Sequence, residues 1–392
     1  MPFRLMRRWA LVWAAACVCA TAAAQSPTPP ELTSTAHGLW DLSSGQRLSA
    51  SGLDTPVEPG GWAKLMTAYL VLDALKSGQL RWEQTVPVSE RAASAPGPLM
   101  FVPAGAQVPV SELVQGLLVQ SGNDAAVVLA EAVSGTSERF VAQMNRQAQA
   151  LGMGNTRYLN STGESQSGQV TTLRDTAQLA MRVWRDFPTR QALWGQARYR
   201  WAQAPQVNDA NPNPLLTRDP SVDGLMAAQG ETLGWALAST AKRPLMSVGG
   251  AAGERRLLAL VWGATSDDDR ARDSQKLLNW GFGAFEAVRL LQPGQAAVSL
   301  PVWMGQSPTV DLGHPDGVVV TVPMGSAAGV RTELVRPQRL LAPLLRGQVL
   351  GTLRVRSAQG VLIQEYPLSV LQPVPQAGAW GRGWDALRLW VQ

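Results

Sequence analysis

Apolar residues recur at helical spacing in several segments after residue 60. Leu65, Ala68, Leu72 and Leu75 lie three or four residues apart, and Gly78 stands where a glycine often ends a helix. The same spacing predicts helices over residues 111–120, 124–133, 138–151, 173–185 and 269–286. Strand patterns cover residues 38–42, 46–49 and 255–263, and a turn at residues 43–45 joins the first two. Alternating strands and helices predict one mixed α/β (α+β) domain over residues 25–290.

The pattern changes near Pro293-Gly294, after which helical spacing is largely absent. Short apolar runs separated by turn residues follow at residues 296–302, 317–322, 329–335, 349–355 and 360–368. Such runs are typical of a small antiparallel β domain. We place this domain at residues 291–375, where Pro373 and Pro375 close it.

The first 24 residues have the organisation of a signal peptide. Arg4, Arg7 and Arg8 precede an apolar run from Trp9 to Ala20, and small residues at 22–24 precede Gln25. The run is too short to span a bilayer. The sequence therefore predicts an exported protein whose mature chain begins near residue 25.

The last segment, residues 376–392, is predicted to be a short amphipathic helix. Trp380, Trp384, Leu387 and Val391 fall on one stripe, and the charged residues of the segment lie away from it. Two interpretations stay open: a helix lying in a membrane interface, which tryptophan and arginine favour, or a helix docked on the β domain. We expect the first, with the protein peripheral on the outer, periplasmic face of the cytoplasmic membrane.

Charge and cysteine content narrow the possible functions. The formal charge of +5 includes three arginines of the signal segment, and without them 31 basic residues face 29 acidic ones. This balance offers no case for nucleic-acid binding. Cys17 and Cys19 both lie in the signal segment, so the mature chain has neither disulfide nor thiolate. His37 and His314 stand far apart, so we expect no metal, no cofactor and no Ser-His-Asp triad.

Two motifs carry candidate chemistry. Lys64, three residues after Gly61, lies at the start of a predicted helix. The helix dipole disfavours a cation there, so an ordinary solvated lysine is more often found elsewhere. Ser121-Gly122-Asn123 lies between two predicted helices, where both polar side chains could simply cap.

Around these motifs the chain resembles the low-molecular-weight penicillin-binding proteins, the serine D-alanyl-D-alanine carboxypeptidases. The resemblance rests on segments in the same order along nearly the whole mature chain: residues 40–48, 58–69, 119–126, 159–163, 184–188, 218–225, 274–282 and 343–351. It implies a penicillin-recognising, β-lactamase/transpeptidase-like domain, a C-terminal β domain and a membrane-associated helix. The implied reaction removes the last D-alanine from peptidoglycan stem peptides through an acyl-enzyme on the serine of S-x-x-K. The lysine of that motif accepts the proton, S-x-N relays it, and K-T-G binds the substrate carboxylate.

The chain departs from this pattern at two motifs. Gly61 stands at the nucleophile position, Lys64 is kept, and the S-x-N motif is intact at Ser121 and Asn123. The K-T-G motif is replaced, as the residues at this place are Met226, Ala227 and Ala228. Two damaged motifs on a preserved scaffold predict a pseudoenzyme that binds stem peptides weakly or not at all, or that binds a cell-wall partner the sequence does not identify.

Other site residues follow from the same resemblance. The backbone N–H groups of Gly61 and Gln229 match the oxyanion hole and do not depend on side chains. Arg270 resembles the carboxylate-binding arginine, or it is an exposed arginine in the turn at residues 267–269. Without a cation at position 226, we expect the pKa of Lys64 to be less perturbed than in the family.

The competing interpretation is an active carboxypeptidase with a non-standard nucleophile or a directly activated water. Ser121 is one candidate, because Lys64 is expected nearby. Ser239 also fits S-x-x-K with Lys242, but no helix follows it and the family alignment places it at a hairpin between strands, which argues against a nucleophile there.

Overall fold

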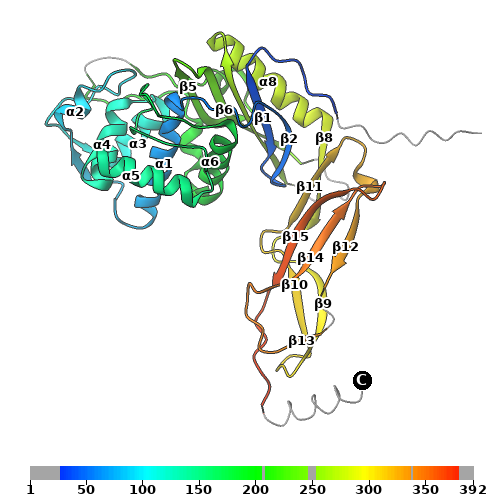
Figure 1. Cartoon of the computed structure of the whole chain (residues 1–392). Helices are drawn as coiled ribbons and strands as arrows, with labels where there is room; N and C mark the ends of the chain where they lie inside the picture. The colour runs from blue at the N-terminus through cyan, green and yellow to red at the C-terminus, as the bar shows by residue number, and fades with distance from the viewer. Residues whose placement is uncertain (1–26, 205–207, 246–252, 337–338, 379–392) are drawn as a thin grey trace, which may run out of the picture.

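The computed structural model describes residues 27–204, 208–245, 253–336 and 339–378. Figure 1 shows a mixed α/β domain followed by a β domain that extends away from it. The expected signal peptide (residues 1–24) and most of the expected terminal helix (residues 379–392) lie outside the described residues. No helix within the described ranges is both long and apolar enough to cross a membrane.

A five-stranded antiparallel sheet forms the centre of the first domain, with strand order β2-β1-β7-β6-β5. Its strands are β1 (Ala36–Asp41), β2 (Gln46–Ser51), β5 (Val222–Gly230), β6 (Gly234–Pro244) and β7 (Glu254–Ala264). The central strand β7 is buried on both faces, as its continuous apolar run predicts. Leu257, Ala259 and Val261 face α8 (Asp267–Ala284), whereas Leu258 and Leu260 join the core on the opposite face. The sheet therefore separates two cores.

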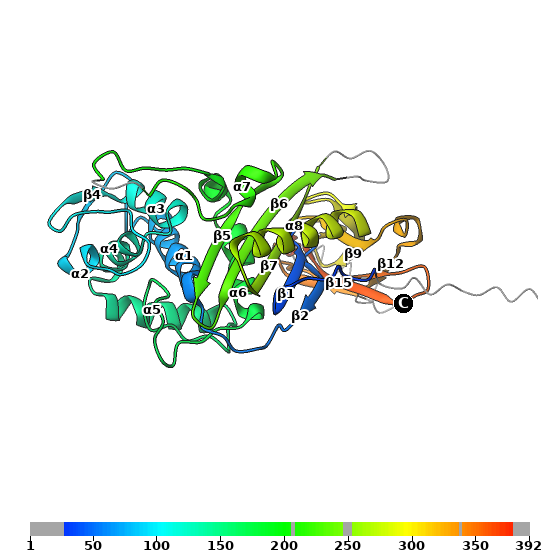
Figure 2. The same ribbon diagram turned by 90° about the horizontal axis from the view of Figure 1, so that it is seen from above.

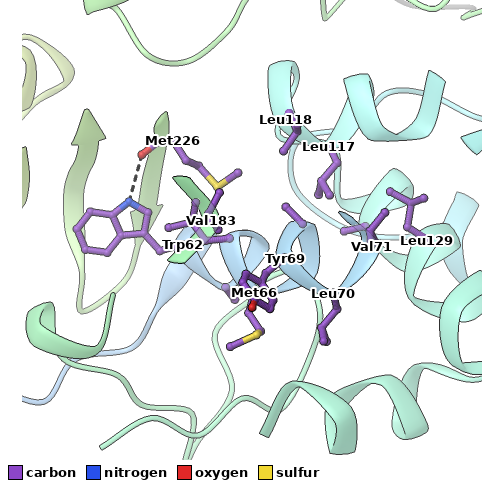
Figure 3. Close-up of a cluster of buried hydrophobic side chains, with 14 of the residues drawn as sticks. Trp62, Met66, Tyr69, Leu70, Val71, Leu117, Leu118, Leu129, Val183 and Met226 are labelled. Carbon is purple, nitrogen blue, oxygen red and sulfur yellow. Dashed lines mark hydrogen bonds between the residues drawn. The ribbon is translucent and has the colours of Figure 1, made fainter. Parts of the chain in front are cut away.

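Most helices lie on the side of the sheet opposite α8 (Figure 2). They are α1 (Ala63–Lys76), α2 (Glu90–Ala93), α3 (Val110–Val119), α4 (Asn123–Ser134), α5 (Ser137–Ala150) and α6 (Leu173–Asp186), with the short α7 (Leu215–Arg218) before β5. Short elements complete this domain: η1 (Gly60–Trp62), η2 (Pro188–Gly195), and the paired strands β3 (Thr85–Pro87) and β4 (Gln107–Pro109). Helix α1 is buried on almost every side and is the axis of this core, as Figure 3 shows around Met66 and Leu70.

The β domain follows α8 directly. Its elements are β8 (Phe285–Leu291), β9 (Ala296–Trp303), β10 (Thr309–Gly313), β11 (Val318–Pro323), η3 (Ala327–Gly329), β12 (Arg331–Val335), β13 (Leu340–Leu341), β14 (Val349–Arg356) and β15 (Leu362–Val370). Most neighbouring strands are antiparallel, and β13 pairs in parallel with β9. Because β8 pairs with β11, the expected domain start at residue 291 falls at the end of the first strand.

A buried polar network joins the two domains. Asp41 at the end of β1 is fully buried and accepts hydrogen bonds from Arg255 Nε (2.7 Å) and from Thr321 Oγ1 of the β domain (2.7 Å). Thr321 Oγ1 also lies 2.8 Å from Ser44 Oγ, and Arg255 donates to the carbonyl of Phe285 (2.7 Å). Buried charges need such partners, so this network fixes the junction between the domains.

Candidate functional site

Gly61 lies in the middle of η1, the short 3₁₀ turn that leads into α1. Two glycines allow three chain segments to meet here. Gly60 has a φ of +50°, and a Cβ on it would lie 2.8 Å from the carbonyl oxygen of Gln229. A Cβ on Gly163 would lie 1.7 Å from the carbonyl oxygen of Gly60, a distance that excludes any side chain. The backbone of β5 and the loop around residue 163 are therefore held directly against the nucleophile position.

Lys64 is in the first turn of α1 and is only 2% exposed. Its Nζ donates a hydrogen bond to the carbonyl oxygen of Thr162 (2.9 Å). The solvated alternative is thus wrong, because the ammonium group is enclosed by the protein. Burial lowers the pKa of Lys64 to about 8, and the charge of Glu164 opposes that shift. We expected the loss of a cation at position 226 to leave Lys64 less perturbed, yet burial alone keeps the pKa far below its ordinary value.

Ser121 and Asn123 flank Gly122, which is the N-cap residue of α4. Neither the Ser121 nor the Asn123 side chain makes a capping hydrogen bond to that helix, so the capping interpretation of both residues is wrong. Ser121 has a φ of +54° and lines the same cavity as Lys64. Asn123 is fully buried, and its Nδ2 donates to Pro96 O (2.6 Å) and to Glu164 Oε1 (2.7 Å). The motif thus presents Ser121 to the cavity and uses Asn123 to fix a carboxylate in its wall.

The replaced K-T-G motif lies on β5, as the resemblance implies. Met226 is buried in the helical core, where its carbonyl accepts a hydrogen bond from Trp62 Nε1 (3.2 Å), as Figure 3 shows. It is not among the described residues that line the cavity. Ala228 lies on the same core face, and its Cβ is 3.3 Å from the place a Cβ on Gly61 would take. Methionine thus extends the core, and two alanines give the groove a wall without hydroxyl or ammonium groups.

These segments enclose a cavity of about 590 Å³. Gly61, Lys64, Ser121, Ala227, Ala228, Gln229 and Arg270 all line it, so the structure brings together nearly all of the residues that the sequence singled out. Gly61 and Gln229, whose backbone N–H groups match an oxyanion hole, are both at its wall.

Arg270 is buried and 4% exposed, so its exposed alternative is wrong. Each of its three nitrogens contacts a protein oxygen. Nε binds Asp267 (2.7 Å), Nη1 binds the carbonyls of Ala228 (2.9 Å) and Ala236 (3.1 Å), and Nη2 binds the carbonyl of Pro212 (2.9 Å). The guanidinium stabilises the β5–β6 wall, and a carboxylate ligand has to compete with these acceptors.

The S-x-x-K pattern at Ser239 and Lys242 is not part of this site. Both residues belong to the middle and end of β6, so the expected position at a hairpin is wrong. Ser239 is completely buried between β5 and β7, and Lys242 is exposed with Glu254 as its partner (3.4 Å). No ligand can reach this serine in the folded protein.

Sequence reasoning missed three carboxylates. Glu58, Glu164 and Glu231 line the cavity, and Glu58 accepts a hydrogen bond from Ser165 (2.8 Å). Glu58 and Glu164 lie in or beside quoted motif segments, but only the fold places them around one opening. Among the described residues at the cavity, the three carboxylates outnumber the cations, and one of those cations is held by Asp267 and by carbonyls.

Comparison with known proteins identifies, in both domains, the family that the sequence motifs resemble. Residues 23–251 match the model described as D-alanyl-D-alanine carboxypeptidase, and residues 285–376 match the C-terminal domain of penicillin-binding protein 5. The D-alanyl-D-alanine carboxypeptidases DacC and DacA of Escherichia coli K12 are 34% and 32% identical. The alignments cover 93% and 98% of this chain and 90% and 96% of those proteins. The crystal structure of penicillin-binding protein 5 from Haemophilus influenzae is similar, with a TM-score of 0.79 and 30% identity over 89% of this chain and all of that one.

Proposed function

The chain belongs to the D-alanyl-D-alanine carboxypeptidase family, and from this premise we propose that it is a non-catalytic member that retains the family's groove. The observation that carries the proposal is Gly61. An acyl-enzyme needs a bond between a side-chain oxygen and the carbonyl carbon of the substrate, and position 61 has no such oxygen. Neither a stem peptide nor a penicillin can then be held covalently by the usual route.

The surrounding residues support the loss of catalysis rather than its transfer to another group. Lys64 is buried with a lowered pKa, as a proton acceptor requires, but it has no hydroxyl at position 61 to activate. The Cβ of Ala228 lies against that position. Ser121 lines the same cavity, as do Thr162 and Ser165, and it is the side-chain nucleophile on which the alternative of an active enzyme rests.

Weak, non-covalent binding of D-alanine-ended stem peptides is the function that the groove supports best. Gly61 and Gln229 supply backbone N–H groups at the wall, which can bind a carbonyl oxygen of the peptide. Carboxylate recognition is reduced, because Met226 and Ala227 offer no donor side chain. The alternative ligand is a cell-wall protein seated in the same groove.

The decisive experiment treats the purified mature chain with a fluorescent penicillin and with a D-Ala-D-Ala peptide. We expect neither labelling nor D-alanine release, and weak peptide binding by calorimetry. Labelling or release at ordinary enzymatic rates contradicts the proposal, and Ser121→Ala then tests whether Ser121 is the nucleophile. If both reactions and peptide binding are absent, the groove no longer serves stem peptides.

We also propose that the mature chain is exported and held at the outer face of the cytoplasmic membrane. Residues 1–24 support export, and the tryptophan-bearing segment after Gly378 supports attachment. N-terminal sequencing of the envelope protein should begin at Gln25. A variant that ends at Gly378 should leave the membrane fraction, and its retention there contradicts attachment by the tail.

A further inference from the structure

Three segments form the far end of the β domain, beside the last described residue. Leu341 of β13 pairs with Trp303 of β9, and the N–H of Ala342 donates to Trp303 O (3.0 Å). The N–H of Ala377 donates to Met304 O (2.8 Å). The last described residues therefore lie at the same end of the β domain as β13.

This end exposes two leucines in a regular pattern. Leu340 and Leu344 are buried in the core of the β domain, but Leu341 is 54% exposed and Leu345 is 69% exposed. Water contact at two large side chains is unfavourable, and nothing in the described part of the chain covers them. Their position beside the tail makes that exposure informative.

Cations outnumber anions at the same end. Residues 301–309, 339–347 and 371–378 contain Arg339 and Arg346 and no acidic residue, and among the described residues the one carboxylate that lines a pocket with Arg346 is Asp311 of β10. By contrast, the strands of the opposite half carry Glu333 and Glu365 in ion pairs. A cationic, apolar surface is complementary to the headgroups and outer acyl region of an anionic bilayer.

We propose that this apolar end, made of Leu341 and Leu345 with Arg339 and Arg346, is a second lipid-binding surface of the protein. The inference rests on the membrane attachment proposed above and deepens it. Residues 379–392 hold Trp380, Trp384 and Trp390, and in sequence they follow Gly378, the last described residue. A tail bound in the interface brings the apolar end to the lipid surface, where both leucines enter the interface and both arginines meet anionic headgroups. Two contacts fix the orientation of the β domain better than a single tail does.

Sedimentation with vesicles of phosphatidylcholine and phosphatidylglycerol in equal parts tests the proposal on the mature chain. The variant Leu341→Glu/Leu345→Glu should weaken vesicle binding about tenfold or more. The matched control is Val361→Glu/Leu362→Glu, which changes two apolar residues of the β14–β15 hairpin at the other end of the domain. These side chains are 65% and 45% exposed, and their substitution should leave vesicle binding unchanged. Equal binding by both variants overturns the proposal and leaves the tail anchor intact, whereas no binding by the unaltered chain removes membrane attachment itself.

A second measurement does not depend on the charge substitutions. The mature chain has no cysteine, so Leu341→Cys and Val361→Cys can each carry one environment-sensitive fluorophore. We expect a blue shift on adding vesicles for the label at position 341 and none at position 361. A label at 341 that stays in water, or a surface that instead mediates concentration-dependent dimerisation without lipid, contradicts the assignment.

Discussion

A Cβ atom added to Gly61 lies 3.3 Å from the Cβ of Ala228, a distance tighter than most Cβ contacts in proteins. The family pattern has a serine at the first position and a glycine at the second. In this chain the small residue and the larger one are exchanged, so the methyl group of Ala228 uses space beside the missing nucleophile. The two departures from the family are therefore in contact with each other.

This contact predicts an energetic coupling between the two positions. Gly61→Ser has to push Ala228 aside by a few tenths of an ångström, whereas Gly61→Ser combined with Ala228→Gly has the room. A double-mutant cycle by urea unfolding should give a favourable coupling of about 0.5–1 kcal/mol. The pair Gly61→Ser with Ala92→Gly is the control, since Ala92 is buried in α2 and does not touch Gly61. Additive free energies for the first pair contradict the contact.

Lys64 predicts a pH-dependent stability. Its pKa is about 8 in the folded chain against 10.5 in the unfolded one, so the unfolded state binds more protons between these values. Above pH 10.5 the amine is neutral in both states, and its burial costs no stability. As the pH falls from 10.5 through 8, the unfolded state takes up the proton first, and the free energy of unfolding decreases. At pH 7, Lys64→Met should raise the free energy of unfolding by about 1–3 kcal/mol, the lower figure allowing for the lost bond to Thr162 O.

Urea unfolding at pH 7 and pH 10 measures this effect. The stabilisation by Lys64→Met should shrink at pH 10, where the wild-type amine is largely neutral. Lys76→Met is the control, because Lys76 is an exposed lysine of the same helix, and its effect should stay within about 0.5 kcal/mol. A destabilised Lys64→Met variant at pH 7 shows instead that the buried charge is well compensated.

Hydrophobic spacing was enough to predict the six longer helices and the buried central strand, but not the four-residue helices α2 and α7. The segment at 111–120 predicted α3 at Val110–Val119, and 255–263 predicted β7 at Glu254–Ala264. The short strands β10 and β13 were missed, because two to five residues carry too little periodicity and are defined by their partners. The expected position of Ser239 at a hairpin was wrong for a related reason. Only the pairing of β6 with both of its neighbours shows that this serine is buried in the middle of the sheet.

For the site, too, the sequence predicted which residues come together but not the contacts that each of them makes. The order of motifs identified Gly61, Lys64 and Ser121, which do meet at one cavity. The chemical state of each group could not be predicted, because it depends on contacts across the fold. Arg270 is bound to carbonyls from β5 and β6, and Glu164 reaches Asn123 across 41 positions of sequence. Burial rather than a neighbouring charge sets the pKa of Lys64.

The buried network at the domain junction predicts that loss of the Asp41 carboxylate strongly lowers the stability of the protein. Asp41→Ala leaves Arg255 buried without its anion and removes the acceptor of Thr321, so the free energy of unfolding should fall by about 3–5 kcal/mol. Asp54→Ala removes the partner of Arg174 in an exposed Asp–Arg pair and should cost less than about 1 kcal/mol. Similar losses for the two variants contradict a structural role for the junction. Small-angle scattering of Asp41→Ala should also report a wider range of domain orientations.

The three carboxylates of the groove predict how ligand binding responds to charge. A D-alanine-ended peptide brings a carboxylate to a cavity lined by Glu58, Glu164 and Glu231, where Arg270 is already bound to protein oxygens. Glu58→Gln/Glu231→Gln removes two like charges near the opening and keeps hydrogen-bonding groups of the same size. The affinity for a D-Ala-D-Ala peptide should rise about threefold to tenfold, since each partly solvated charge contributes about 0.3–0.7 kcal/mol.

Calorimetry at low and high salt separates this effect from a change of shape. Salt should strengthen binding to the unaltered chain by screening the repulsion, and it should change binding to the double variant little. Glu83→Gln is the control, because this exposed glutamate does not line the cavity and its removal should leave affinity unchanged. If the double variant binds the peptide more weakly, the glutamates contact an amino group of the ligand. The groove of this chain then selects its ligands by a cation rather than by the terminal carboxylate.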